Sequence, residues 1–221
     1  MDFNGSNQYL SETFSTDWNP GSGDFTLSMW LYSPVNAVQS VFSSIESGEK
    51  NGIWFAIAGS GTTPALWISD ATSAEFHNFG AGNFTVGSLH HYLIRRLSST
   101  MYFFKDGVSV YTPTSSTEVI TDSTEPTTIG KRSTGPTYYY DGDIFDLRYY
   151  NRGLSDAEIK IIVESKGADR ITNGLNLRLR MTEETTGSTS TTDVNDVSPN
   201  GGHAFTPSNS PLFQAQPTRN N

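Results

Sequence analysis

Among the groups in this 221-residue chain that could catalyse a reaction are the carboxylates of 23 Asp and Glu. Two of them facing one sugar, about 5 Å apart, can hydrolyse a glycoside with retention. The nearest string of acids, Glu118, Asp122 and Glu125, has the wrong spacing for one face of a strand. Glu183 and Glu184 are adjacent, so on a strand they would point to opposite faces. We interpret these acids as solvated surface groups and predict no hydrolytic site.

The histidines and serines also form no recognisable nucleophilic site. The sequence contains no G-x-S-x-G turn, which would expose a nucleophilic serine. His90 and His91 are adjacent, so one of them must face inward, where a hydrogen-bonded structural histidine is a better interpretation than a catalytic base. With neither chemistry supported, we predict that the protein is not an enzyme.

Two groups of oxygen-bearing side chains could suit a calcium ion, which prefers hard oxygen ligands. Asp141 and Asp143 flank a glycine, and Asp193, Asn195 and Asp196 cluster in an expected loop. Neither group has the spacing of an EF-hand, and acids in turns explain both. We therefore predict no cofactor: calcium is compatible with the ligand types but is not supported by the spacing, and the metal content stays unknown.

Three consecutive tyrosines, Tyr138, Tyr139 and Tyr140, enter an expected strand. They cannot all face a core, because successive residues of a strand point to opposite faces. At least one ring should be exposed and could stack on a sugar or a partner. The alternative interpretation is a partly buried aromatic end of the strand. We take the three tyrosines as candidate ligand or partner contacts.

Composition excludes several other classes of function. The formal charge of −9 and pI near 4.8 argue against nucleic acid and against anionic membranes. No apolar run approaches the roughly 20 residues of a membrane span, and MDFNGSNQYL does not have the form of a signal peptide. There is no cysteine, so disulfides and thiolate chemistry are excluded. We expect no nucleic-acid partner and no membrane insertion.

Period-two alternation of apolar and polar residues dominates the chain and predicts an all-β fold. The best examples are 25–32, 144–150 and 174–181; in the second, Ile144, Asp146, Arg148 and Tyr150 should share one face. One short helix is predicted near 155–166, since Ser155 and Glu158 form a capping box and Gly167 can end the helix. The 174–181 strand is predicted to pair beside the N-terminal strand of 2–10.

The closing stretch GDIFDLRYYNRGLSDAEI, the opening DFNGSNQYL and FTLSMW, and the HHYLI…FKDG hairpin resemble laminin-G-like, concanavalin A-like jelly-roll domains. Phe145 departs from the acidic residue usual in that family. The resemblance implies a two-sheet antiparallel jelly-roll sandwich over residues 1–205. Residues 174–205 are similar to a piece that commonly precedes the opening strand, so they either complete this domain in permuted order or begin a truncated repeat.

Residues 206–221 form a polar, Pro-rich segment that we predict to be an arm docking on another subunit. Leu212 and Phe213, its large apolar side chains, are the expected anchors.

Two functions follow from the resemblance and the arm. The first is a non-enzymatic structural or adhesive component of a phage or virus particle, such as a capsid decoration, head-fibre or tail-associated protein. Its partners would be other virion proteins, copies of itself or surface glycans, and its location the virion surface. The alternative is a secreted, extracellular, lectin-like carbohydrate-binding module. The absence of a leader and of cysteines favours the first.

Overall fold

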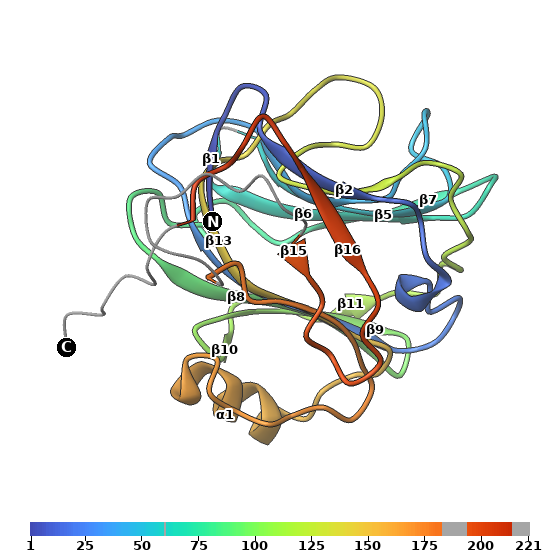
Figure 1. The fold of residues 1–221 in the computed structure, drawn as a ribbon. Helices are drawn as coiled ribbons and strands as arrows, with labels where there is room; N and C mark the ends of the chain where they lie inside the picture. Colours follow the sequence, from blue (N-terminus) through green and yellow to red (C-terminus); the bar gives the residue numbers. More distant parts are fainter. Residues whose placement is uncertain (60, 183–193, 214–221) are drawn as a thin grey trace.

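Two antiparallel sheets face each other in the computed structural model, which describes residues 1–59, 61–182 and 194–213 (Figure 1). Sheet A contains β1 (Asp2–Asn4), β13 (Asp141–Tyr150), β3 (Phe25–Tyr32), β8 (His90–Leu97), β9 (Thr100–Lys105) and β10 (Val108–Ser109), with β11 (Thr114–Ser115) on β9 and β14 (Leu175–Leu179) on β13. Sheet B contains β15 (Val194–Asn195), β16 (Ala204–Ser208), β2 (Tyr9–Glu12), β12 (Thr127–Ile129), β4 (Gln39–Ser43), β5 (Gly52–Ala58), β6 (Thr63–Ser69) and β7 (Ala74–Asn78). The predicted all-β jelly-roll sandwich is confirmed.

The main core lies between the sheets, where alternating residues of both inner faces meet. Leu27, Phe55 and Phe103 are fully buried there, and so are Leu177 and Leu179 of β14. A short 3-10 helix, η1 (Thr16–Trp18), adds the buried Trp18 to the same core. Residues on both sides of the predicted helix therefore contribute to one continuous core.

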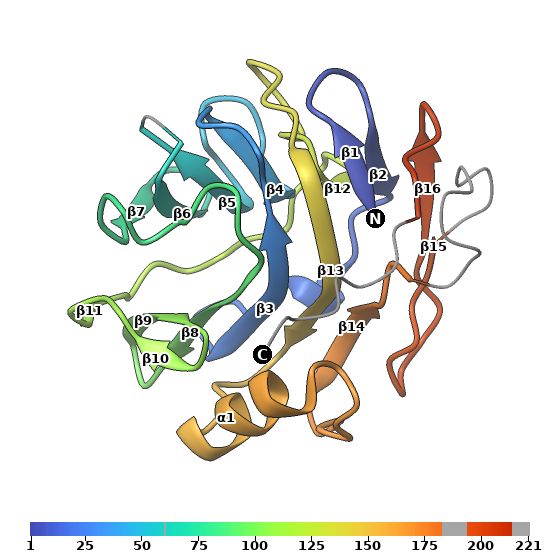
Figure 2. The same cartoon turned by 90° about the vertical axis from the view of Figure 1, so that its left-hand side faces the viewer.

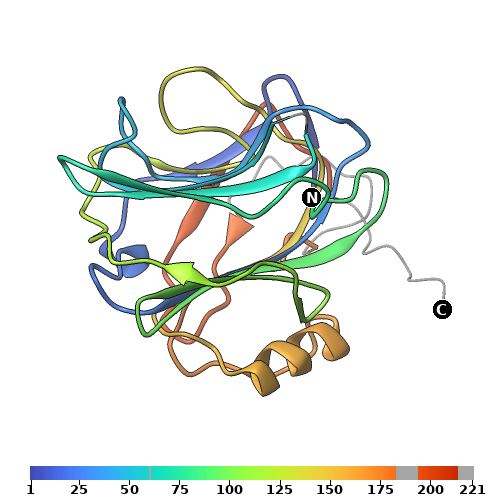
Figure 3. The same cartoon turned by 180° about the vertical axis from the view of Figure 1, so that it is seen from behind.

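One α-helix, α1 (Asp156–Ser165), is found among the described residues, and it packs on the face of sheet A that points away from sheet B (Figure 3). Ile159 and Ile162 lie against Leu93, Tyr150 and Leu175 in a second, smaller core. At ten residues, α1 is too short to cross a membrane. The predicted helix is confirmed to within one residue at each end.

The predicted capping box begins α1. Ser155 Oγ accepts from the Glu158 amide at 3.3 Å, and Glu158 Oε2 accepts from the Ser155 amide at 2.8 Å. Arg152 donates to both carboxylate oxygens of Glu158, at 2.6 and 3.0 Å. The hydrogen bond from Arg152, with those from Ser155, lowers the pKa of Glu158 to about 2. The carboxylate thus joins the 151–155 corner to the helix.

β13 contains a β-bulge at Asp146 that changes the phase of the strand. The register with β3 shifts between Phe145 and Arg148, and Asp146 has a φ of 46°. Strict alternation predicted Ile144 on the same face as Asp146 and Arg148, and this is wrong. Ile144 faces the main core with Leu147, because the bulge places one extra residue on this strand. Asp is among the few residue types that tolerate the left-handed conformation.

The strand that follows α1 pairs with a different neighbour from the one predicted. β14 pairs with β13, with Leu179 opposite Leu147, and not with residues 2–10. β1 occupies the same edge of β13 nearer its start, with Asp2 opposite Asp143. The C-terminal partner of the N-terminal segment is β16, which pairs with β2 (Figure 2).

The expected C-terminal arm starts inside β16, and its two anchors lie on the chain's own sandwich. Asp2 and Leu212 exchange two backbone hydrogen bonds of 2.7 and 3.1 Å. Phe213 is 2% exposed and belongs to the main core. These apolar side chains are therefore used within this fold and are not left for a neighbouring subunit; residues 214–221 lie outside the described part.

Replacing Glu158 by Gln should lower the free energy of unfolding by about 1 kcal/mol at pH 7, because the amide can still accept from Ser155 but loses the charge-assisted bonds to Arg152. A carboxylate with a lowered folded pKa contributes stability above its unfolded pKa, near 4.5, and loses it as pH falls towards 2. Urea unfolding at pH 7 and pH 3 should show the variant's deficit shrinking with pH. Glu164→Gln, at the exposed end of α1, is the control; an equal deficit there would contradict the cap's role.

Replacing Phe213 by Ala should destabilise the sandwich by about 3 kcal/mol, because it leaves a cavity in the main core. Leu212→Ala, at a half-buried position, should cost less. Thermal and urea unfolding of the two variants measures both. Unchanged melting of Phe213→Ala would show that this side chain is not part of the core.

Candidate functional site

Three loops meet at one end of the sandwich and form a pocket of about 290 Å³. They are the β1–β2 turn, the segment before β4 and the segment before β13; the first and last lie side by side in Figures 1 and 2. We call this the tyrosine pocket; its lining includes Gly5, Val38, Gln39, Tyr138, Tyr139 and Asp141. It is the place where the structure puts two of the three predicted contact tyrosines.

Tyr138 and Tyr139 are partly exposed, as the contact prediction requires. Tyr138 stacks on Trp54 at 6.0 Å and 8° between ring planes. Tyr139 lies 6.3 Å from Tyr9, and the Lys131 ammonium lies 4.5 Å from the centre of the Tyr9 ring. Both rings are therefore held by aromatic neighbours while one side remains open to the pocket.

Tyr140 differs from the prediction, because it is fully buried. Its hydroxyl donates to the Tyr32 carbonyl at 3.1 Å, and its backbone bonds to Gly5 and Gly130. A residue tied on all sides cannot contact a ligand at the surface. Tyr140 instead joins the tyrosine pocket to the core.

Asp141 gives the tyrosine pocket an available acceptor. Its carboxylate makes no hydrogen bond or ion pair with any residue that the structure describes. Burial, together with the nearby charge of Asp2, raises the pKa of Asp141. Beside it Gln39 is fixed: its Oε1 accepts from the Asp141 amide at 2.8 Å and its Nε2 donates to Ser33 at 3.0 Å. The pocket thus combines two rings, a rigid amide and an acceptor with spare capacity.

An aromatic row that sequence reasoning missed continues from Tyr138 across the outer face of sheet B. Trp54 stacks on Trp67 at 4.1 Å, and Trp67 lies 4.6 Å from Phe76, which is 50% exposed. These are directly opposed residues of β5, β6 and β7. The alternation within each strand indicated outward rings, but only the register brings them into one row. The Arg132 guanidinium lies 4.1 Å from the centre of the Trp54 ring.

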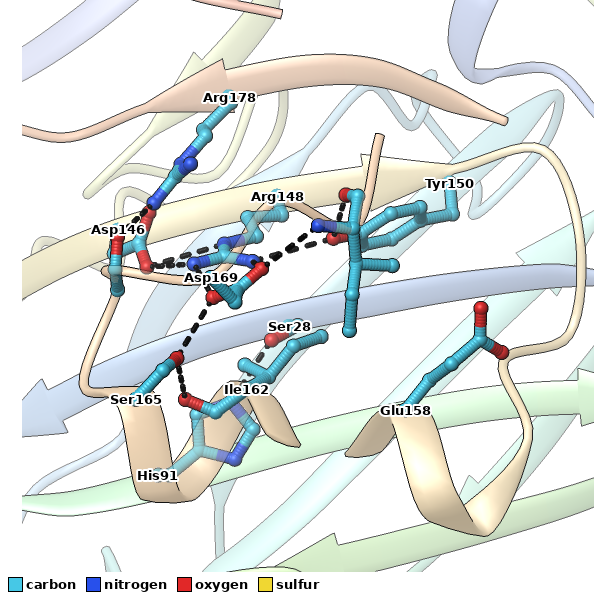
Figure 4. Close-up of polar contacts among 12 residues, drawn as sticks. Ser28, His91, Asp146, Arg148, Tyr150, Glu158, Ile162, Ser165, Asp169 and Arg178 are labelled. Carbon is cyan, nitrogen blue, oxygen red and sulfur yellow. Dashed lines mark hydrogen bonds and ion pairs between the residues drawn. The ribbon is translucent and has the colours of Figure 1, made fainter. Parts of the chain in front are cut away.

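A network of buried charges lies between sheet A and the loop after α1 (Figure 4). Arg148, with a fully buried side chain, donates to Asp169 through both terminal nitrogens at 2.8 Å and to Asp146 at 2.5 and 3.1 Å. Arg178 Nε donates to the other Asp146 oxygen at 2.8 Å, and Ser165 donates to Asp169 at 3.0 Å. Burial alone would raise the pKa of Asp169, but Arg148 outweighs it and holds that pKa well below its usual range.

The histidines are placed in structural contacts. His91 is fully buried and lies 2.8 Å from the Ser28 hydroxyl, itself 1% exposed, while His90 meets Asp106 at 2.6 Å. The prediction that one of the adjacent pair faces inward is confirmed. Since Ser28 and His91 are both enclosed, this serine and histidine cannot reach a substrate.

The acids considered in the sequence do not assemble into a metal or hydrolytic centre among the described residues. Glu118 accepts from Ser73 at 2.7 Å and Asp122 from Asn19 at 2.5 Å, so each is used locally. No group of three or more His, Asp or Glu side chains within 1–59, 61–182 and 194–213 is arranged to hold a metal ion. Asp193, Glu183 and Glu184 lie outside these ranges, and the absence of a cofactor stays a prediction.

Comparison with known families decides the classification. The model of the concanavalin A-like lectin/glucanases superfamily matches residues 4–160. The chain belongs to this family. The resemblance predicted from the closing strand, opening strands and hairpin is therefore confirmed, and no curated protein matches the sequence.

Solved structures support the same fold at low identity. One is a Bacteroides ovatus protein whose description proposes carbohydrate binding: TM-score 0.69, 12% identity, 97% of this chain and 60% of that one covered. A heptameric pentraxin from Limulus polyphemus has a TM-score of 0.55 and 14% identity, with 75% of this chain and 82% of the pentraxin chain covered. The binding domain of Paraclostridial mosquitocidal protein 1 has a TM-score of 0.52 and 12% identity, with 72% of this chain and 41% of that chain covered. This family member thus spans 60% of the length of the Bacteroides protein, and these identities establish the fold alone.

Replacing Asp169 by Asn should cost about 3–5 kcal/mol of stability, because it leaves a buried guanidinium partly uncompensated. Asp156→Asn is the matched control. Asp156 also forms an ion pair with an arginine, Arg95, at 2.7 Å, but its side chain is 82% exposed. Its replacement should therefore lower the free energy of unfolding by less than about 1 kcal/mol. Urea unfolding at pH 7 separates the two, and equal losses would contradict a special role for the buried network.

Proposed function

We propose that this chain is a lectin-like, carbohydrate-binding module whose ligand occupies the tyrosine pocket. The observation that carries the proposal is the meeting, in one pocket, of two partly exposed tyrosine rings and a carboxylate with no partner among the described residues. Small-molecule sites are typically concave, with apolar or aromatic walls and a few placed polar groups.

The chemistry of a sugar matches this lining. The C–H face of a pyranose can pack on a flat ring, as other apolar groups do, while its hydroxyls donate to acceptors. Asp141 is partly desolvated without a partner, which is costly unless a ligand supplies hydrogen bonds. Hydrogen bonds to a charged acceptor are the stronger kind, so ligand hydroxyls would find their best partner there.

Binding without hydrolysis is favoured by the number of carboxylates. Glycosidases generally use two acids flanking the scissile bond. Among the described residues that line the tyrosine pocket, Asp141 is the single carboxylate. A pocket with one acid can orient a sugar but does not supply a nucleophile together with an acid.

Of the two functions predicted from the sequence, we therefore propose the second, the carbohydrate-binding module, and not the virion component. The description of the Bacteroides protein, similar over 97% of this chain, supports it. The prediction of an assembly arm loses its main argument, because Leu212 and Phe213 pack within the chain's own sandwich. Location on a virion, with virion proteins as partners, stays a prediction without support from the family or the fold; an extracellular location fits the proposed binding.

A panel of neutral oligosaccharides, followed by calorimetry on each one retained, tests the proposal. Tyr139→Ala and Asp141→Asn should each weaken binding about tenfold, the loss expected for an aromatic contact or a charge-assisted hydrogen bond worth about 1.4 kcal/mol. Phe76→Ala, at the exposed end of the aromatic row, is the control and should bind normally.

Three results would contradict the proposal. Binding of no oligosaccharide removes the function. Unchanged affinity in Tyr139→Ala and Asp141→Asn places the site elsewhere, and a loss confined to Phe76→Ala assigns it to the aromatic row. Circular dichroism and melting temperatures of each variant exclude unfolding as the cause.

A further inference from the structure

A second pocket, of about 420 Å³, lies where the loop after α1 meets β14. Its lining includes Lys166, Gly167, Asp169, Arg170, Arg178 and Arg180. It belongs to sheet A and contains no residue of the tyrosine pocket. We call it the cationic pocket.

The charge of this lining is opposite to that of the chain. Four of the 14 Lys and Arg side chains line it, against two of the 23 acids, Asp146 and Asp169. With Arg148 directly behind them, five cations of the described residues face two anions, a local excess of three positive charges. The lining of the cationic pocket is therefore locally positive, although the whole chain has a formal charge of −9.

Both acids of the cationic pocket are already used. Asp169 is held by Arg148, and Asp146 by Arg148 and Arg178, with side-chain exposures of 1% and 2% for the two acids. The exposed side chains of Lys166, Arg170 and Arg180 make no ion pair with any residue of the described ranges. The excess cations are therefore available to a ligand.

Arg178 provides an independent observation that points to a ligand. Its side chain is 8% exposed, yet it lines the pocket. Nε donates to Asp146 and Nη2 to the Gly167 carbonyl at 2.6 Å, while Nη1 makes no hydrogen bond to a described residue. Figure 4 shows this guanidinium fixed beside Asp146. A nearly buried donor held in place with one nitrogen to spare suits a hydrogen-bond acceptor.

The C-terminal end of α1 opposes anion binding, because a helix C-terminus carries about half a negative charge. Its last carbonyls are partly satisfied: Ile162 accepts from Ser165, and Ser165 accepts from the Ala168 amide. Lys166, Arg170 and Arg180, which have no ion pair among the described residues, outweigh this partial charge. The described residues of the lining include no aromatic side chain, so they would recognise a ligand by charge and not by ring stacking.

We propose that the cationic pocket binds a sulfate or carboxylate group of an acidic saccharide. The saccharide part rests on the proposed function; the oxyanion part rests on the pocket alone. Arg presents a planar set of donors that matches such groups, and fixed donors lose little entropy on binding. The tyrosine pocket would then serve neutral sugar units and the cationic pocket charged ones.

The test compares dextran sulfate, unmodified dextran and sodium sulfate at constant ionic strength, using calorimetry and NMR titration of the folded chain. The variant Lys166→Gln/Arg180→Gln removes two pocket charges. The control Lys50→Gln/Lys160→Gln removes two exposed charges outside the cationic pocket. We expect dextran sulfate to bind, unmodified dextran to bind more weakly, the pocket variant to lose at least tenfold in affinity and the control to change less than twofold.

Each other outcome overturns the proposal. Equal losses in both variants would show a general charge effect. Sodium sulfate binding without dextran sulfate binding would assign the pocket to a free anion. Binding of neither dextran sulfate nor sodium sulfate would show that the cationic pocket is not an anion site. Tyr139→Ala, which should not alter dextran sulfate binding, separates this failure from failure of the tyrosine pocket.

Discussion

The side chain of Arg148 is completely buried on the outer face of sheet A, and this constraint organises the elements around it. A guanidinium removed from water is unfavourable unless it is paired and fully hydrogen-bonded. Asp146 reaches it because of the bulge in β13, and Asp169 reaches it because α1 ends at Ser165 and the chain turns back. The bulge, the length of the helix and the path of the following loop are therefore linked through one side chain.

β13 connects this network to both candidate sites. The strand begins at Asp141 in the tyrosine pocket, pairs with β1 and β3, and reaches the cationic pocket at Asp146. Central strands are the most rigid parts of a sandwich, so side chains on them are positioned more precisely than side chains on loops. One strand thus fixes a polar group in each pocket, while the loops before β13 and after α1 supply other parts of the walls.

Local signals in the sequence were enough for the all-β class, the helix and its cap, because Ser155 and Glu158 act within one turn and alternation is a property of each strand. The two-sheet jelly roll was predicted from the family resemblance. Non-local features could not be predicted. The aromatic row of Trp54, Trp67 and Phe76 depends on the register of three strands. The polar composition around Phe213 suggested an arm. Two backbone hydrogen bonds between the neighbouring Leu212 and Asp2 instead place Phe213 in the main core. Of the tyrosine pocket, Tyr138 and Tyr139 were predicted, but the place of Asp141 beside them required the tertiary structure.

The net charge of −9 does not exclude an acidic ligand, because charges act over a limited distance. At physiological ionic strength the screening length is about 8 Å, so acids on the far side of the sandwich contribute little at either pocket. Within the part of the chain that the structure describes, the tyrosine pocket contains one carboxylate without an ion pair, and the cationic pocket contains three cations without one. The two pockets therefore differ in the sign of their charge, and a saccharide with neutral and charged units could distinguish between them.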